Sequence, residues 1–267
     1  MAIPAGKEVD MAEQATIDAI AEANVSTFIQ FQYDDLAAKA QDLYASTKYQ
    51  ILENYLKNEK NLRILSVGCG SGEMSLQLAA RGHSVLGIDI EPTHVALSKR
   101  NAKLFGSPGN CRFAVSSIED FESEEDFDCV VSTDVLEHIR DDELAFVNMM
   151  RAVKPGGLVL LSVPAGPWLF GYHDEQLGHF RRYTKKTLHQ LVEPFCDVQV
   201  MRYFGYTLVP VCLLYSKWLR QRYPVAGSAD VRRRPVRALA LRTLMQLDRR
   251  TRMPFGTSLL MKGFKKS

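Results

Sequence analysis

Strand-like and helix-like segments alternate from residue 62 onward, and this alternation constrains the fold more than any other feature of the chain. It is typical of a parallel sheet that is covered by helices on both faces. Strands are expected at residues 62–67, 84–89, 111–115, 127–133, 158–163, 197–203 and 257–264, and helices at 73–81, 92–104, 141–153 and 185–192. The sequence therefore predicts an α/β fold with a doubly wound, mostly parallel sheet of seven strands.

The regions outside this alternation are expected to be helical. Residues 12–58 contain neither Pro nor Gly and carry apolar side chains at helical spacing, so residues 1–58 are predicted to form an N-terminal helical cap. Residues 59–205 and 254–267 form the predicted core, and residues 206–253 form a basic helical insertion before the last strand. A chain of 267 residues can bury one sizeable core of this kind.

Charge is distributed unevenly along the chain, although the net charge is only +2. Residues 202–267 hold 15 Lys and Arg against Asp230 and Asp248, which gives +13 there and −11 in the remainder. Such asymmetry indicates either an anionic partner (a membrane surface, a phosphorylated substrate or nucleic acid) or a solvated helical face. The apolar and aromatic residues 206–223 are expected to form an interfacial helix, a cover over a ligand pocket or a part of the core.

The cysteines and the start of the chain favour a cytoplasmic protein. The five cysteines form no C-x-x-C pair and no Cys/His cluster, so we expect reduced core cysteines and no metal site. The first residues carry charges at Lys7 and Glu8 and do not resemble a signal peptide. The longest apolar run, residues 203–215, is shorter than the roughly 20 residues that span a bilayer. A cytoplasmic location is expected, with peripheral contact at the inner membrane face through the basic tail.

A glycine-rich turn, Gly68-Cys69-Gly70-Ser71-Gly72, joins the first predicted strand to the following helix. Its glycines let backbone N–H groups approach a ligand without obstruction by a Cβ atom. A dinucleotide-binding loop would place another glycine where Glu73 stands, and this carboxylate would repel a pyrophosphate. Asp89, at the end of the second predicted strand, can accept hydrogen bonds from a ribose diol. The turn therefore favours a ligand that has no phosphate at this point.

Four motifs follow one another in the order residues 64–72, residues 87–89, residues 127–131 with 135–139, and residues 153–157. They resemble the ordered motif set of class I S-adenosylmethionine-dependent methyltransferases. The resemblance implies S-adenosylmethionine as cofactor and a Rossmann-like sheet whose last strand is antiparallel. The cofactor contacts that it implies are Gly68, Cys69, Gly70 and Gly72 at the methionine part, Asp89 at the ribose, Ile90, Ser117 and Ile118 around the adenine, and Thr133 and Asp134 at the sulfonium. Ser66 and Ser117 stand where the family often has acidic residues.

The same resemblance places His138 close to the transferring methyl group. Similar histidines act as general bases in some small-molecule methyltransferases, and the alternative is a hydrogen-bonded histidine that holds the loop. A base is needed mainly where the acceptor must lose a proton near neutral pH, a task that suits His or a carboxylate. His138 is therefore a candidate catalytic residue, and Glu137 beside it is a weaker one.

Residues 167–183 follow the fifth predicted strand and concentrate aromatic and ionisable side chains where an acceptor should bind. They resemble a loop with the pattern D-E-x-x-G-H-x-R-R-Y of bacterial methyltransferases that are associated with saccharide, lipid or secondary-metabolite modification. We expect His179 to act as a base, Tyr172 and Tyr183 to orient the acceptor, His173 to contact it, and Arg181 or Arg182 to anchor an anionic group. The alternative is a salt-bridged scaffold of Asp174, Glu175, Arg181 and Arg182.

These features predict a methyltransferase that acts on the oxygen or nitrogen of a small molecule, with a saccharide, lipid-linked or secondary-metabolite acceptor. A nucleic-acid methyltransferase is the first alternative because of the basic tail, although residues 132–135 lack the N/D-P-P-Y/F pattern of enzymes that methylate base amines. A catalytically silent cofactor-binding or partner-binding protein is the second alternative. The third alternative is a nicotinamide-dependent dehydrogenase, which Glu73 disfavours.

Overall fold

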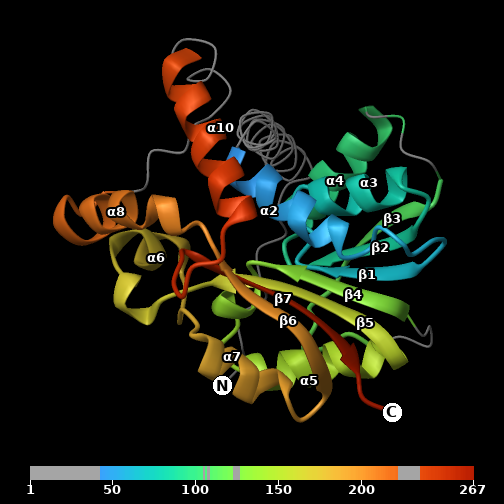
Figure 1. The fold of residues 1–267 in the computed structure, drawn as a ribbon. Helices are drawn as coiled ribbons and strands as arrows, with labels where there is room; N and C mark the ends of the chain where they lie inside the picture. Colours follow the sequence, from blue (N-terminus) through green and yellow to red (C-terminus); the bar gives the residue numbers. More distant parts are fainter. Residues whose placement is uncertain (1–42, 105, 107–108, 123–126, 222–234) are drawn as a thin grey trace, which may run out of the picture.

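The computed structural model describes residues 43–104, 106, 109–122, 127–221 and 235–267 (Figure 1). Most of the predicted N-terminal cap and the arginine-rich residues 232–234 lie outside the described residues. The α-helices and strands of the described residues are α2 (Leu43–Asn54), β1 (Arg63–Val67), α3 (Glu73–Ala80), β2 (Ser84–Asp89), α4 (Pro92–Leu104), β3 (Cys111–Val115), β4 (Phe127–Thr133), α5 (Asp142–Ala152), β5 (Val153–Pro164), α6 (Tyr172–Leu177), α7 (Lys185–Val192), β6 (Cys196–Phe204), α8 (Val209–Cys212), α10 (Pro235–Arg250) and β7 (Ser258–Lys265).

The seven strands form one sheet in the order β3-β2-β1-β4-β5-β7-β6. Strands β1 to β5 pair in parallel, whereas β7 is antiparallel to both β5 and β6. The predicted fold class is therefore confirmed, including the antiparallel last strand. After β1, the chain adds β2 and β3 on one side of this strand and then returns to add β4 and β5 on the other side. In open α/β sheets such a reversal point is where ligands bind.

The strand registers bring three predicted site segments to one edge of the sheet. Val67 at the end of β1 pairs with Ile88 of β2 on one side and with Ser132 of β4 on the other. The glycine turn after β1, the carboxylate that ends β2 and the residues that end β4 therefore lie next to one another. This proximity follows from the parallel pairing alone, since parallel strands place their carboxyl ends at the same edge.

Both faces of the sheet are covered, as the unbroken apolar composition of its central strands requires. Successive side chains of a strand point to opposite faces. Thus Val159 and Leu161 of β5 pack in the cluster that includes α5 and α7, whereas Leu158 and Leu160 pack in the cluster that includes α2, α3 and Met245 of α10. Figure 1 shows α5 and α7 below the sheet and α2, α3, α4 and α10 above it.

Two predicted segments differ in detail from the structure. Strand β5 begins at Val153 rather than at residue 158, because Val153 already pairs with Phe127 and the following Lys-Pro-Gly-Gly segment bulges out before Leu158 pairs with Cys129. The apolar stretch after β6 is divided into three short helical pieces, at Tyr206–Leu208, Val209–Cys212 and Leu213–Trp218. In the part of the chain that the structure describes, no helix has both the length and the apolar character that a membrane span requires.

Candidate active site

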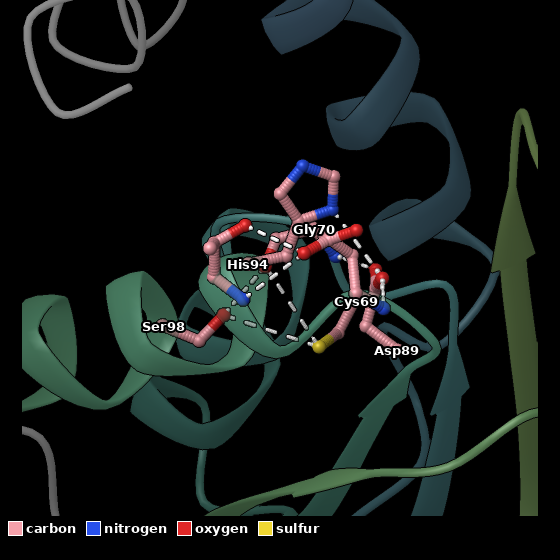
Figure 2. A network of polar contacts seen from close by, with 7 residues as sticks. Cys69, Gly70, Asp89, His94 and Ser98 are labelled. Atoms are coloured by element: carbon pink, nitrogen blue, oxygen red, sulfur yellow. Dashed lines mark hydrogen bonds and ion pairs between the residues drawn. The ribbon is translucent and has the colours of Figure 1, made fainter. Parts of the chain in front are cut away.

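The glycine turn after β1 is held by backbone and side-chain hydrogen bonds to β2 and α4 (Figure 2). The N–H of Cys69 donates to the carbonyl of Ile88 at 2.9 Å, and the hydroxyl of Ser98 donates to the carbonyl of Gly70 at 2.7 Å. Gly70 has a φ of 52°, and a Cβ atom placed on it would meet no protein atom within 4 Å. The turn therefore presents open space above Gly70, in a backbone conformation that glycine adopts without strain.

Asp89 ends β2 beside this turn, and it is almost fully buried. One carboxylate oxygen accepts from the N–H of Gly70 at 2.8 Å, and the other accepts from the N–H of Glu91 at 3.0 Å and lies 3.3 Å from Nδ1 of His94. Burial acts to raise the pKa of Asp89, but these hydrogen bonds outweigh it, so the pKa lies below its ordinary value. The side chain is therefore an anionic acceptor that also fixes the glycine turn.

A cavity of about 840 Å³ opens at this edge of the sheet. Of the predicted cofactor residues, the lining contains Gly68, Cys69, Gly70, Asp89, Ile90, Ser117, Ile118, Thr133 and Asp134. The exception is Gly72, where a Cβ atom would meet Phe113 and Ser98 at about 3 Å. The structure thus brings nine residues from four separate loops to one cavity, while their individual roles toward a cofactor stay predictions.

The cavity residues differ in exposure and in chemistry. Ile90 projects an apolar side chain that is 70% exposed. Ile118 is buried, and its carbonyl accepts from the Asn148 amide at 3.1 Å, which fixes the loop after β3. The Ser117 hydroxyl accepts from the N–H of Glu119 at 3.1 Å. Burial, reinforced by the charge of Asp89, raises the pKa of the Cys69 thiol to about 12, so this residue stays a neutral thiol.

Helix α2 closes the cavity from the other side with residues that the sequence did not single out. Lys48 is buried and forms an ion pair with Asp134 at the end of β4. Burial acts to lower the pKa of Lys48, but the negative charge of Asp134 outweighs it, so the pKa lies above its ordinary value. Tyr44 and Tyr49 flank Lys48, and burial raises the pKa of both phenols to about 12. The side of the cavity next to Thr133 is therefore built partly by α2.

Two histidines meet beside the Asp134 end of the cavity. His138 lines the cavity, and its ring lies edge-on to that of His179, with 4.5 Å between the ring centroids. Burial and the neighbouring His179 lower the pKa of His138, while Asp134 opposes this effect. Nδ1 of His179 lies 2.9 Å from the fully buried carboxylate of Asp174. The predicted catalytic residues His138 and His179 thus form one cluster, and Asp174 orients it.

The remaining predicted acceptor residues are placed differently. His173 lines the cavity, whereas Tyr172 is partly exposed at the start of α6 and is not part of the lining. Arg182 is buried and donates to Asp174 at 2.7 Å and to the carbonyl of Ala165 at 3.2 Å. The Tyr183 hydroxyl is bonded to Asp142 at 2.6 Å; burial and this bond raise the pKa of the phenol.

Arg181 also forms an ion pair with Asp142 and donates to the carbonyl of Arg140 at 2.5 Å. Of the salt-bridged scaffold of Asp174, Glu175, Arg181 and Arg182, the structure therefore contains the Arg182–Asp174 pair, whereas Arg181 pairs with Asp142 and Glu175 lies 3.9 Å from Arg220. Contact of Arg181, Arg182 and Tyr183 with an acceptor stays a prediction.

Comparison with known proteins identifies the family. A model that describes a methyltransferase domain matches residues 58–203, which is more than half of the chain. The chain belongs to the class I S-adenosylmethionine-dependent methyltransferases. The match includes the glycine turn, Asp89 and both histidines of the cluster.

Curated relatives carry the name ubiquinone biosynthesis O-methyltransferase. The protein of Rhizobium rhizogenes is 30% identical over 166 residues, which cover 54% of this chain and 66% of that protein. The protein of Rhizobium etli is 36% identical over 103 residues, which cover 39% of this chain and 41% of that protein. The chain therefore spans between about two fifths and two thirds of the length of these relatives.

Solved structures share the fold at low sequence identity. The N-methyltransferase NodS of Bradyrhizobium japonicum, solved in complex with S-adenosyl-L-homocysteine, aligns with a TM-score of 0.57 at 16% identity over 85% of this chain and 89% of that one. A TehB-like methyltransferase of Corynebacterium glutamicum aligns with a TM-score of 0.56 at 19% identity over 92% and 100% of the two chains. At these identities the likeness concerns the fold alone.

Proposed function

We propose that this methyltransferase transfers the methyl group of S-adenosylmethionine to a hydroxyl group of a small molecule. The observation that carries the proposal is the cluster of His138 and His179 beside Thr133 and Asp134, at the end of the cavity where the family places the sulfonium. A hydroxyl is a poor nucleophile until its proton is held or removed, and imidazole nitrogens can do this. The names of the O-methyltransferase relatives agree with an oxygen acceptor.

The residues of the cavity fit S-adenosylmethionine. The open space above Gly70 admits a ligand close to the backbone, the anionic carboxylate of Asp89 is suited to a ribose diol, and the exposed Ile90 offers an apolar surface to a flat base. When bound, the cofactor supplies a methyl group that its sulfonium has already activated. The task of the protein is then to align the acceptor oxygen with that methyl group and to exclude water.

The histidine cluster supplies the polar part of the acceptor side. Asp174 fixes the ring of His179 through Nδ1, because a carboxylate there favours a proton on that nitrogen and leaves Nε2 with a lone pair. One ring nitrogen of His138 donates to the carbonyl of Leu177, which leaves the other without its proton. The lone pair of His138 is thus available to an acceptor hydroxyl in the cavity, whereas His179 lies behind the cavity lining and supports the ring of His138 edge-on.

We further propose that the acceptor carries an apolar chain. The last of the short helical pieces after β6, Leu213–Trp218, contacts the η2 turn (Pro167–Leu169) and α6. It exposes Trp218 by 84% and Leu214 by 43%, and Leu219, which follows it, is 48% exposed. Lys217 and Arg220 stand among these side chains. An apolar surface with basic residues is suited to the headgroup region of an anionic membrane, where a lipid-linked acceptor would be found.

The test uses S-adenosylmethionine that carries a deuterated methyl group. The purified protein is incubated separately with the lipid, the aqueous small-molecule and the RNA fractions of an extract of the source organism, and the labelled product is identified by mass spectrometry. We expect a labelled O-methyl group in the lipid fraction. Label on nitrogen, label in RNA or no label in any fraction would overturn the proposal, whereas O-methyl label in the aqueous fraction would overturn only the apolar acceptor.

Variants then test the histidine cluster. With the identified acceptor, His138→Ala and His179→Ala should lower kcat by about 10²- to 10⁴-fold, the usual contribution of acid–base groups, while S-adenosylmethionine affinity changes little. His189→Ala is the matched control, because this histidine is exposed on α7, away from the cavity. Wild-type kcat in both cluster variants would refute the role of the cluster.

A further inference from the structure

Glu137 is a buried carboxylate that the proposed mechanism does not use. It lies in the turn at Leu136–His138, and it is completely buried. Apart from a contact with its own backbone N–H, neither of its oxygens has a hydrogen-bond partner among the described residues. A buried carboxylate normally accepts several hydrogen bonds or pairs with a cation, so an unsatisfied one requires a specific explanation.

The neighbours of this carboxylate are metal-ligand groups. One carboxylate oxygen of Glu137 and one ring nitrogen each of His138 and His179 lie within 4.8 Å of one another. Atoms at such spacing can surround a single ion, because metal–ligand distances of about 2.0–2.2 Å place ligand atoms roughly 3–4 Å apart. We infer that Glu137, His138 and His179 form a binding site for one divalent transition-metal ion, which reverses the sequence-based expectation that the protein has no metal site.

The surroundings of the three residues are those of a metal site. Asp174 accepts from Nδ1 of His179, and metal-bound histidines usually donate their second ring nitrogen to a carboxylate or a carbonyl in this way. His138 makes the corresponding bond to the carbonyl of Leu177. Asp174 is itself held by Arg182 and by the N–H of Gly171, so the outer hydrogen bonds are complete before a metal ion arrives.

A second explanation for Glu137 is less consistent with its contacts. Burial, reinforced by the charge of Asp134, raises the pKa of this carboxyl, and a protonated acid would avoid a buried charge. A protonated carboxyl has an O–H group that must donate to an acceptor, yet no described residue accepts from it. A cation satisfies both oxygens without this requirement.

The ligand set indicates the class of metal ion. Two imidazoles and one carboxylate suit Zn²⁺, Fe²⁺ or Co²⁺, whereas Mg²⁺ and Ca²⁺ prefer oxygen ligands. Three protein ligands leave a coordination position for water or substrate. His138 lines the cavity, so the site is adjacent to the proposed acceptor position.

If the proposed function holds, the ion would take the acceptor hydroxyl as a ligand and lower its pKa. The hydroxyl would release its proton to water, its oxygen would form the bond to the methyl carbon, and the electron pair of the breaking C–S bond would pass to sulfur. In that case the two histidines would act on the hydroxyl through the ion that they ligate, in place of the direct contact proposed above, and the loss of kcat expected for His138→Ala and His179→Ala is unchanged.

Binding is tested with Co²⁺ as a visible probe, on protein that has been stripped with a chelator. Wild-type protein should bind one Co²⁺ per chain, with d–d absorption typical of mixed nitrogen and oxygen ligation, and excess Zn²⁺ should displace it. Glu137→Gln and His179→Ala should weaken binding at least 100-fold, and Asp174→Asn, which perturbs only the orientation of His179, about 10- to 100-fold. His189→Ala serves as the control for loss of a surface histidine and should bind as wild type does.

Folding and cofactor binding are followed on the same samples. Thermal melting and S-adenosylmethionine affinity separate loss of the site from loss of the fold, and Glu137→Gln should retain both because it removes an unpaired buried charge. Binding of Co²⁺ to Glu137→Gln as tight as to wild type, or no stoichiometric Co²⁺ binding by the wild type, would overturn the inference. Failure of Glu137→Gln to fold leaves Asp174→Asn and His179→Ala to decide.

The outcome of this test is separable from that of the proposed function. Stoichiometric Co²⁺ binding without methylation of any acceptor would support the metal site and contradict the proposed function. Methylation at an undiminished rate by chelator-stripped protein, together with no stoichiometric Co²⁺ binding, would do the opposite.

Discussion

Replacement of Asp89 by Asn tests the cofactor site most directly, because the change keeps the shape of the side chain and removes its charge. Asp89 accepts from Gly70 through one oxygen and from Glu91 through the other. An amide group has only one oxygen, so one of these two N–H groups must lose its acceptor. A hydrogen bond to a buried charged group contributes about 1.5–3 kcal/mol. The glycine turn therefore loses about this much support, and the ribose would meet a neutral acceptor in place of a carboxylate.

We expect Asp89→Asn to weaken S-adenosylmethionine binding about 10- to 100-fold, as measured by isothermal titration calorimetry. Asp128→Asn is the matched control, because Asp128 accepts from the N–H of Arg63 at 2.8 Å and from Lys154 at 2.7 Å near the opposite end of the sheet. The control should lose some stability and retain its affinity. Equal affinity of Asp89→Asn and wild type would refute the assignment, and so would an equal loss in both variants.

Three other results are expected. S-adenosylmethionine affinity should not change between about pH 8 and pH 5, because the pKa of Asp89 lies below its ordinary value and the side chain stays ionised. The stability that this carboxylate contributes is present above its unfolded pKa of about 4 and is lost as the pH falls through its folded pKa. Measuring the melting temperature as the pH is lowered will show this loss. Gly70→Val should abolish S-adenosylmethionine binding in calorimetry, because the new side chain fills the open space above the turn. The free energy of unfolding should fall by only about 1–2 kcal/mol, which is the cost of a non-glycine residue at positive φ. In chemical denaturation, Asp134→Asn should destabilise the protein by roughly 3 kcal/mol and Lys48→Met by roughly 1–2 kcal/mol. Asp134→Asn leaves the buried charge of Lys48 unpaired, whereas Lys48→Met leaves the carboxylate of Asp134, which is 37% exposed. The opposite order of the two effects would contradict this account.

The fold could be predicted from the sequence because each strand and helix has its own local pattern. The helix at residues 185–192 agrees at both ends with α7, which Thr184 caps by accepting from the N–H of Thr187. The start of β5 was missed because Val153 pairs across a bulge, and no local pattern indicates which side of a Pro-Gly-Gly segment a strand includes.

The grouping of the predicted cofactor residues around one cavity could be foreseen for a related reason. Its residues stand directly after strands, and parallel pairing brings strand ends together whatever the loops do. Lys48 was missed because its partner Asp134 lies 86 residues away in the chain, and nothing in the local sequence of α2 distinguishes it from a solvated lysine. The contacts of residues 167–183 were harder to predict. Whether Arg182 faces a ligand or Asp174 depends on tertiary packing, which the composition of the loop does not reveal.

Asp134 connects the parts of the site that the sequence left separate. Its backbone adopts a φ of 55°, which costs a non-glycine residue about 1–2 kcal/mol, and three contacts hold it there. Its N–H donates to the carbonyl of Ser162 at 2.8 Å, one carboxylate oxygen accepts from the Ser162 hydroxyl at 2.9 Å, and the other pairs with Lys48. The turn that follows carries Glu137 and His138. Helix α2 therefore closes the cofactor cavity and, through Lys48, also fixes the start of the turn that presents the histidine cluster, so the position of the cap and the geometry of the proposed metal site depend on the same ion pair.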